Sequence, residues 1–188
     1  MPRLQERATY EDLLKVPENM IAELIDGEVF ASPRPSGPHT NAASVLVMLI
    51  GSAYQIGTGG PGGWWIQVEP EVHLGRDVLV PDIAGWRRVR MPEVPRNHVY
   101  SVRPDWTCEV LSHSTARVDR EKKLPIYAQH GVAHAWLVDV DQQMLEVKRL
   151  VEGRWTDAGR FGGGEIIRAE PFEAIEIDMK LVWGPPPA

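Results

Sequence analysis

The chain contains a single cysteine, Cys108, among its 188 residues. One cysteine excludes an internal disulfide and any zinc site built from several cysteines. No apolar run reaches the 18 or more residues of a membrane-spanning helix, and residues 1–6 lack the hydrophobic stretch of a signal peptide. These absences predict a cytoplasmic protein that makes no membrane contact.

Several enzyme motifs are also missing. The chain has no Gly-x-Ser-x-Gly elbow for a serine nucleophile. Its histidines at 73, 98, 113, 130 and 134 show no metal-ligand spacing such as a helical His-x-x-x-His. The glycine-rich segment 57–63 lacks a following Lys-Ser/Thr and precedes a strand-like run, so it fits neither a P-loop nor a dinucleotide-binding turn. We interpret it as a connection between a helix and a strand.

The composition, 43% hydrophobic and 24% charged, is that of an ordinary globular protein. We expect one domain over residues 1–183 and a disordered tail over residues 184–188. The net charge is −6, yet residues 76–123 carry ten Lys or Arg against seven Asp or Glu. This basic stretch indicates either a polyanionic substrate or a solvated basic face.

The N-terminal third predicts two helices and a hairpin. Thr9 and Asp12 have the spacing of a helix cap, so a short helix should begin there. Asp26-Gly27 separates the strand-like runs 20–25 and 28–31, which is a strong hairpin signal. Apolar residues then recur at helical spacing over residues 39–55, which predicts a buried core helix.

The rest of the chain predicts mainly strands. Residues 64–74, 78–86 and 105–112 are expected strands, and residues 114–129 an expected helix, kinked at Pro125 and ended by Gly131. A second hairpin pairs residues 135–139 with 144–148, and two more strands follow at about 149–155 and 174–177. This order predicts a mixed α/β (α+β) fold, with a central mixed sheet flanked by helices.

Two acidic residues stand out because each lies within a short apolar run. Asp82 follows Leu79-Val80-Pro81, and Glu109 lies between Cys108 and Val110. A carboxylate among apolar neighbours is costly unless it is hydrogen-bonded, paired or bound to a cation. These acids therefore predict a Mg²⁺ site that also accepts Mn²⁺, with the Val110 carbonyl as a further ligand. The alternative is that both acids face water.

Four other residues are candidates for the same site. Lys123 could position the attacking water, although a helical lysine is more often solvated, and its neighbour Lys122 is the substitute. Glu23 lies on the first hairpin strand among apolar residues and is a possible third acid. His39 begins the core helix and could contact phosphate or a metal-binding acid, or simply cap the helix.

These residues lie in segments that resemble, in order, the Uma2 family (DUF820) of the PD-(D/E)XK restriction-endonuclease-like superfamily. The segments are Glu23-Leu24-Ile25-Asp26-Gly27-Glu28, the loop ending at His39, Val80-Pro81-Asp82-Ile83-Ala84, Cys108-Glu109-Val110-Leu111-Ser112, Ser114-Thr115, Asp119, Lys123, Tyr127, Gly131-Val132 and Trp136-Leu137-Val138-Asp139. The resemblance implies a magnesium site of Asp82 and Glu109 supported by Glu23. It also implies that Lys123 replaces the lysine that the superfamily pattern places at position 111, where this chain has leucine.

The leading hypothesis is therefore a Mg²⁺-dependent endonuclease that cleaves DNA. One alternative is a catalytically silent module of the same fold that binds nucleic acid or forms oligomers, and another is a hydrolase of a different phosphate ester. Enzymes of this superfamily often act as dimers, so the resemblance leaves a homodimer or higher homo-oligomer open.

Overall fold

The computed structural model describes residues 7–184 and begins with the predicted helix and hairpin. In helix α1 (Tyr10–Leu13), the Asp12 carboxylate accepts the Thr9 backbone N–H, as the predicted cap requires. Strands β1 (Met20–Ile25) and β2 (Glu28–Pro33) pair along their whole length. Asp26 and Gly27 between them both have positive φ, the conformation that favours an Asp-Gly turn.

Both predicted long helices are present. The core helix comprises α2 (Gly37–Ile50) and a π-helical continuation, η1 (Gly51–Ile56). The second helix runs through α3 (Ala116–Val118), the π-helical turn η2 (Asp119–Lys123) and α4 (Leu124–Gln129). Its irregular turn ends two residues before Pro125, which has no N–H to donate, and Gly131 follows the end of the helix with positive φ.

Two strands that the sequence predicted as continuous are each divided between two sheets. The segment 64–74 forms β3 (Trp64–Val68) and β4 (Glu71–Leu74), and the segment 78–86 forms β5 (Asp77–Leu79) and β6 (Ile83–Arg87). Pro70 and Pro81 lie at the two breaks. Because proline cannot donate to a strand ladder, each proline marks the point where the chain leaves one sheet for the next.

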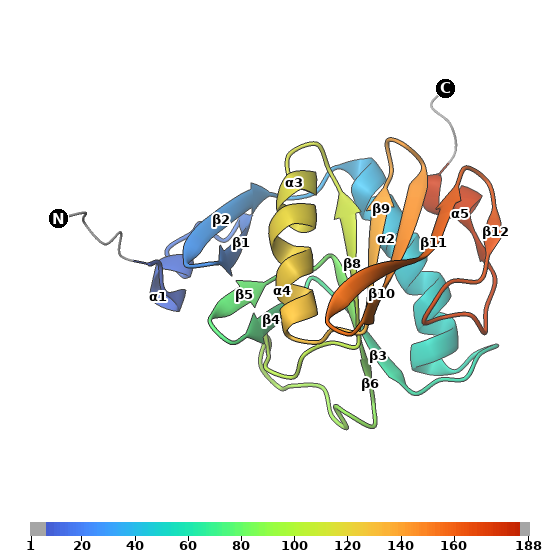
Figure 1. Cartoon of the computed structure of the whole chain (residues 1–188), viewed down its shortest axis with the longest axis horizontal. Helices are drawn as coiled ribbons and strands as arrows, with labels where there is room; N and C mark the ends of the chain where they lie inside the picture. Colours follow the sequence, from blue (N-terminus) through green and yellow to red (C-terminus); the bar gives the residue numbers. More distant parts are fainter. Residues whose placement is uncertain (1–6, 185–188) are drawn as a thin grey trace.

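The resulting architecture has two main sheets, shown in Figure 1. The five-stranded sheet has the order β2-β1-β5-β4-β7, with β7 at Val99–Tyr100, and the six-stranded sheet has the order β11-β10-β9-β8-β6-β3. The remaining strands of the larger sheet are β8 (Trp106–Leu111), β9 (His134–Asp139), β10 (Met144–Val151) and β11 (Arg154–Gly162). Strands β8 and β9 are parallel whereas the other neighbours are antiparallel, so this sheet is mixed.

The C-terminal predictions are only partly correct. The strand expected at 149–155 is interrupted at residues 152–153, where β10 turns into β11. The strand expected at 174–177 is limited to β13 (Ile177–Asp178), which pairs with β12 (Ile166–Ile167) and leads into the unpredicted helix α5 (Met179–Trp183). Of the expected tail, residues 185–188 lie outside the described residues.

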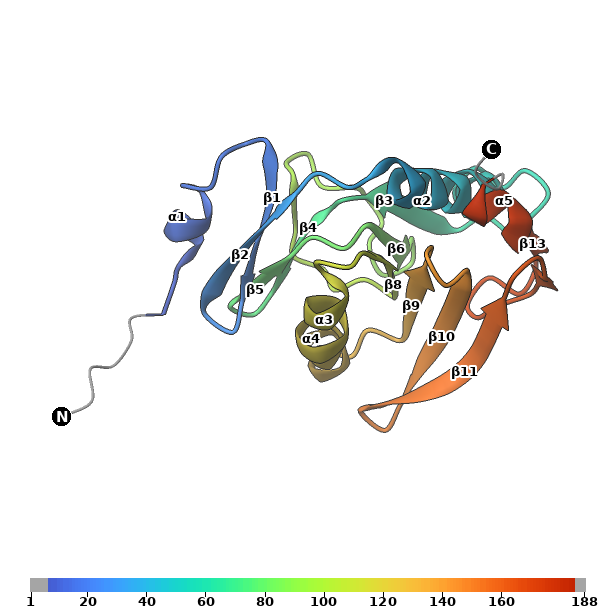
Figure 2. The same ribbon diagram turned by 90° about the horizontal axis from the view of Figure 1, so that it is seen from above.

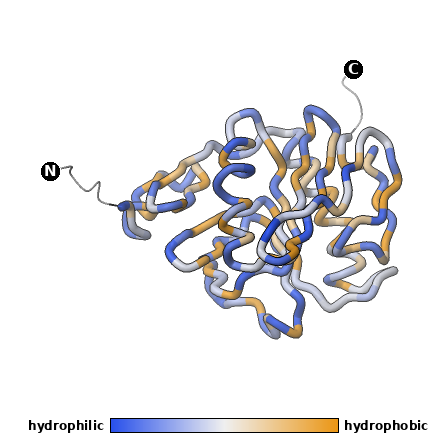
Figure 3. Tube along the Cα trace, viewed as in Figure 1, coloured by the Kyte–Doolittle hydropathy of each residue, from blue (hydrophilic) through white to orange (hydrophobic). Residues whose placement is uncertain are grey.

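The two helices cover opposite faces of the six-stranded sheet, as Figure 2 shows. Along β8, Trp106, Cys108 and Val110 pack in the core that includes α2. Leu111 packs in the second core, which includes α4. Successive side chains of a strand point to opposite faces, so Glu109 faces the same helix as Leu111. In Figure 3 the middle of that helix is hydrophilic, which matches its charged turn η2.

No helix within residues 7–184 combines the length and the apolar character needed to cross a membrane.

Candidate active site

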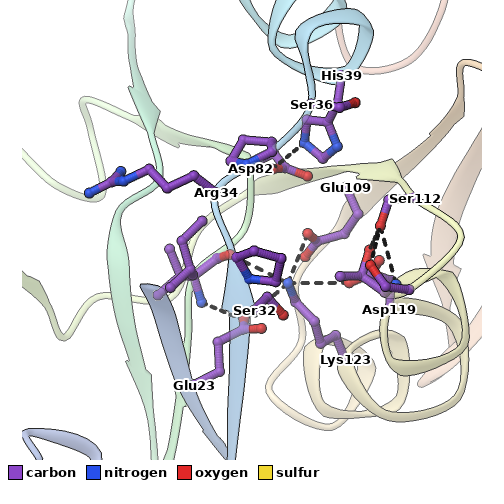
Figure 4. Close-up of a pocket in the computed structure, with 16 residues that line it drawn as sticks. Glu23, Ser32, Arg34, Ser36, His39, Asp82, Glu109, Ser112, Asp119 and Lys123 are labelled. Atoms are coloured by element: carbon purple, nitrogen blue, oxygen red, sulfur yellow. Dashed lines mark hydrogen bonds and ion pairs between the residues drawn. The ribbon is translucent and has the colours of Figure 1, made fainter. Parts of the chain in front are cut away.

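A cavity of about 240 Å³ lies where the chain passes from the five-stranded to the six-stranded sheet. The link between β5 and β6, residues 80–82, contributes Val80 and Asp82 to its wall. Strand β1, the loop before α2, strand β8 and the helix α3–α4 contribute the other residues. Figure 4 shows Glu23, His39, Asp82, Glu109 and Lys123 gathered around this cavity.

Asp82 lies immediately before β6, and each of its carboxylate oxygens is held by one partner. His39 Nε2 is 2.7 Å from Oδ1, and the Val110 backbone N–H donates to Oδ2 at 2.7 Å. His39 is in the first turn of α2, and Val110 is in β8, so the carboxylate is fixed between a helix and a strand. Each oxygen keeps a second lone pair, which leaves Asp82 able to bind a cation.

Glu109 is 2% exposed, and both of its carboxylate oxygens also have protein partners. Tyr127 donates its hydroxyl to Oε1 at 2.6 Å, and Lys123 donates to Oε2 at 2.9 Å. Burial raises the pKa of Glu109 well above its usual value, while the positive charge of Lys123 opposes this rise. The ammonium group of Lys123 is thus the main favourable contact for the charged carboxylate.

Lys123 is 3% exposed and lies among three carboxylates. Besides Glu109, its Nζ is 3.0 Å from Glu23 Oε1 and 3.4 Å from Asp119 Oδ1. Burial alone would lower the pKa of Lys123, but the surrounding carboxylates raise it well above its usual value. The ammonium therefore stays charged and offsets part of the negative charge of the buried acids.

The neighbouring residue Lys122 lies elsewhere. Its Nζ is 3.7 Å from Glu28 Oε2 and 5.0 Å from the centre of the Phe30 ring, both on β2. Of the two adjacent lysines, Lys123 is the one that reaches the acids. Glu23 is held in place because its Oε1 also accepts the Val80 N–H at 2.7 Å.

Two further residues, Asp119 and Tyr127, lie at the site although the sequence predicted no chemical role for them. Asp119, Lys123 and Tyr127 are spaced four apart, so they share one face of the helix, and that face meets Glu109. The spacing itself is the signal that would have found them. The rim of the cavity adds several polar side chains, namely Ser32, Arg34, Ser36, Ser112, Ser114 and Thr115.

Comparison with known proteins identifies the family and the fold. The model of the Uma2 family, described as "Putative restriction endonuclease", matches residues 7–180. The chain belongs to the Uma2 family. No curated protein matches it.

The fold is also similar to a solved structure from Anabaena variabilis ATCC 29413, described as "a putative nuclease belonging to DUF820". The TM-score is 0.74 at 24% identity, and the match covers 93% of this chain and 97% of that one. The similarity confirms the predicted fold class, a mixed sheet flanked by helices.

The acidic side chains of this Uma2 site offer the type of ligand atom that a hard divalent cation binds. Asp82 and Glu109 line one cavity and offer carboxylate oxygens, the ligands that Mg²⁺ prefers. Within residues 7–184, no three His, Cys, Asp or Glu side chains are arranged to hold a metal ion. The reason is visible in the contacts, since Glu23, Glu109 and Asp119 converge on the Lys123 ammonium. Asp82 is the acid that does not contact this ammonium.

Proposed function

We propose that this Uma2 protein is a Mg²⁺-dependent endonuclease that hydrolyses phosphodiester bonds of DNA, with Mn²⁺ as a substitute metal. One observation carries the proposal. Asp82 and Glu109 line the same cavity as Lys123, and each of the three side chains is held by hydrogen bonds to other residues. Preorganised charges in a water-poor site are the main source of catalysis in phosphoryl transfer.

In this proposal, Asp82 and Glu109 would hold the cation, and the Val110 carbonyl would supply a further oxygen. The N–H of Val110 already donates to Asp82. The bound cation would stabilise charge on the phosphoryl oxygens and lower the pKa of a water molecule. Lys123 would orient that water and offset the charge of the phosphate. Tyr127 and His39 keep the two acids in place through their hydrogen bonds.

The decisive variant is Asp82→Asn, tested on plasmid and linear DNA with Mg²⁺ or Mn²⁺. Asparagine keeps the shape of the side chain and can still accept the Val110 N–H, so the fold should survive while the charge is lost. We expect cleavage to fall by about a hundredfold or more, because removing a charge-stabilising group has this cost in other enzymes. The matched control is Asp157→Asn, since Asp157 is 80% exposed on β11 and should be neutral.

Equal cleavage by the parent and Asp82→Asn would refute the proposal. Salt-dependent DNA binding without cleavage under either metal would favour a catalytically silent module instead. Cleavage of a small phosphodiester but not of DNA would indicate a different phosphate ester as substrate.

A further inference from the structure

A second cavity of about 270 Å³ adjoins the acidic one along α2. The two cavities share the residues Pro35, His39 and Asp82, so only one side-chain layer separates them. The carboxylate of Asp82 is part of this layer. If a ligand places a phosphate beside Asp82, the group attached to that phosphate can therefore reach the second cavity.

The second cavity differs from the first in the chemistry of its wall. Besides the shared Pro35, its apolar residues are Ala43, Val47 and Met48 from α2 and Val68 from the end of β3. Met48 is 63% exposed and Val68 is 57% exposed. Large apolar side chains that face water beside a polar site are typical of a surface that contacts the apolar part of a ligand.

Polar groups stand at the edges of this apolar surface. Thr40, Ser44 and Glu69 complete the wall and offer both donors and acceptors. Glu69 also forms an ion pair with Arg34, at 3.6 Å between Nη1 and Oε2. Arg34 lines the first cavity and Glu69 the second, so this pair lies at their boundary. Figure 4 shows the Arg34 side chain extending away from the acids.

We propose that the second cavity binds the base of an unpaired nucleotide whose phosphate lies in the acidic cavity. This inference rests on the proposed nuclease function and deepens it, because it names the class of substrate. A nucleotide joins a charged phosphate to a flat base through one sugar, and the two adjoining cavities match these two parts. The apolar side chains would contact the faces of the base, and the polar groups its edges.

The substrate class follows from the availability of the base. In a paired duplex the base faces are stacked and its hydrogen-bonding edge is occupied, so a base enters a protein pocket only when it leaves the duplex. The substrate is therefore single-stranded DNA, or DNA that is locally unpaired at the reacting nucleotide.

The test measures binding of the full chain to a short intact single-stranded oligonucleotide and to a series of otherwise identical abasic strands. Each abasic strand lacks one base, and the series moves the missing base along the strand one position at a time. Ca²⁺ replaces Mg²⁺, so that a cation of the same charge is present. We expect the parent to bind the intact strand about fivefold or more tighter than the best-placed abasic strand.

Two variants remove the apolar contact, Met48→Ser and Val68→Thr, and both change exposed side chains that should not affect folding. We expect each to reduce the preference for the intact strand to less than about twofold, while binding of the abasic strand stays unchanged. The control is Leu181→Ser on α5, which is 54% exposed and lies outside both cavities. It should keep the parent's preference.

A parent that binds both strands equally would overturn the inference, as would Met48→Ser and Leu181→Ser having the same effect. Tighter binding of a fully paired duplex than of the single strand would also overturn it. Cleavage with Mg²⁺ is scored separately. Cleavage without a preference for the base refutes the subsite alone, whereas the predicted preference without any cleavage refutes the nuclease and leaves the subsite standing.

Discussion

At the scale of single residues, Lys123 determines the electrostatic state of the site. Its ammonium lies within 3.4 Å of carboxylate oxygens of Glu23, Glu109 and Asp119. Buried carboxylates without a positive partner are strongly destabilising, and the one buried ammonium contacts three of them and offsets part of their charge. Lys123 therefore stabilises the fold in addition to its proposed role toward the attacking water.

This dual role predicts a large difference between two adjacent lysines. Lys123→Met should lower the free energy of unfolding by about 3 kcal/mol or more, because it leaves buried carboxylates unpaired. Lys122→Met should cost less than about 1 kcal/mol, since Lys122 makes one 3.7 Å ion pair with Glu28, whose side chain is 69% exposed. Urea denaturation at neutral pH with a chelator present measures both. Equal effects would contradict the assignment of Lys123 as the internal counter-ion.

The sequence predicted the site acids more securely than their partners. Asp82 and Glu109 could be recognised because an acid in an apolar run needs a physical reason to be there. Lys123 could not be distinguished from Lys122 without the family resemblance, because the direction of a helical side chain depends on the surface that the helix packs against. The four-residue spacing places Tyr127 on the same helix face as Lys123, but its hydrogen bond to Glu109 joins two elements that only the fold brings together.

At the scale of elements, local signals predicted the helices and hairpins well, but not the membership of each strand. The apolar character continues across Val78-Leu79-Val80 and Ile83-Ala84, so periodicity alone predicts one strand there. Pro81 was visible in the sequence, yet only the structure shows that it separates two different sheets. The break also explains why Asp82 lies at the end of a link rather than within a strand.

The helix that carries Lys123 is also tied to the sheet by a contact that responds to pH. Arg120 in η2 donates two hydrogen bonds to Glu146 on β10, at 2.6 and 3.3 Å, and Lys148 adds an ion pair. These partners lower the pKa of Glu146 from 4.5 to about 2. A lowered folded-state pKa means that the contact stabilises the fold above pH 4.5 and loses its effect as the pH falls toward 2.

We therefore expect Glu146→Gln to destabilise the protein by about 1 kcal/mol at pH 7, a value discounted for the partial exposure of the contact. The difference from the parent should shrink at about pH 3, because Glu146 of the unfolded parent is then protonated. Glu176→Gln is the control, since the side chain of Glu176 is 63% exposed beside Arg168. Urea titrations at the two pH values measure the effect, and a difference that grows in acid would refute it.

At the scale of the whole molecule, the site lies where two sheets and two helices meet. Glu23 comes from the five-stranded sheet, Glu109 from the six-stranded sheet, His39 from α2 and Lys123 from the opposite helix. No local segment contains more than a part of this arrangement, which is why the sequence predicts its members but not its geometry. The ion pairs of Lys123 give the buried acids a positive partner that belongs to the chain itself.

Metal binding should consequently stabilise a protein that is already folded. Removing divalent cations with a chelator should leave the parent folded, because Lys123 still forms its ion pairs with three of the acids. At a Mn²⁺ concentration about a hundredfold above its Kd, binding to the folded state alone adds about 2.7 kcal/mol, or roughly 5–10 °C in Tm for a chain of this size.

Asp82→Asn should show little of this rise, since it loses a charged ligand of the proposed site, while Asp157→Asn should match the parent. Thermal melts with and without Mn²⁺ distinguish these outcomes. An equal rise in Asp82→Asn would place the bound ion elsewhere, and unfolding by the chelator would show that Lys123 does not compensate the acids by itself.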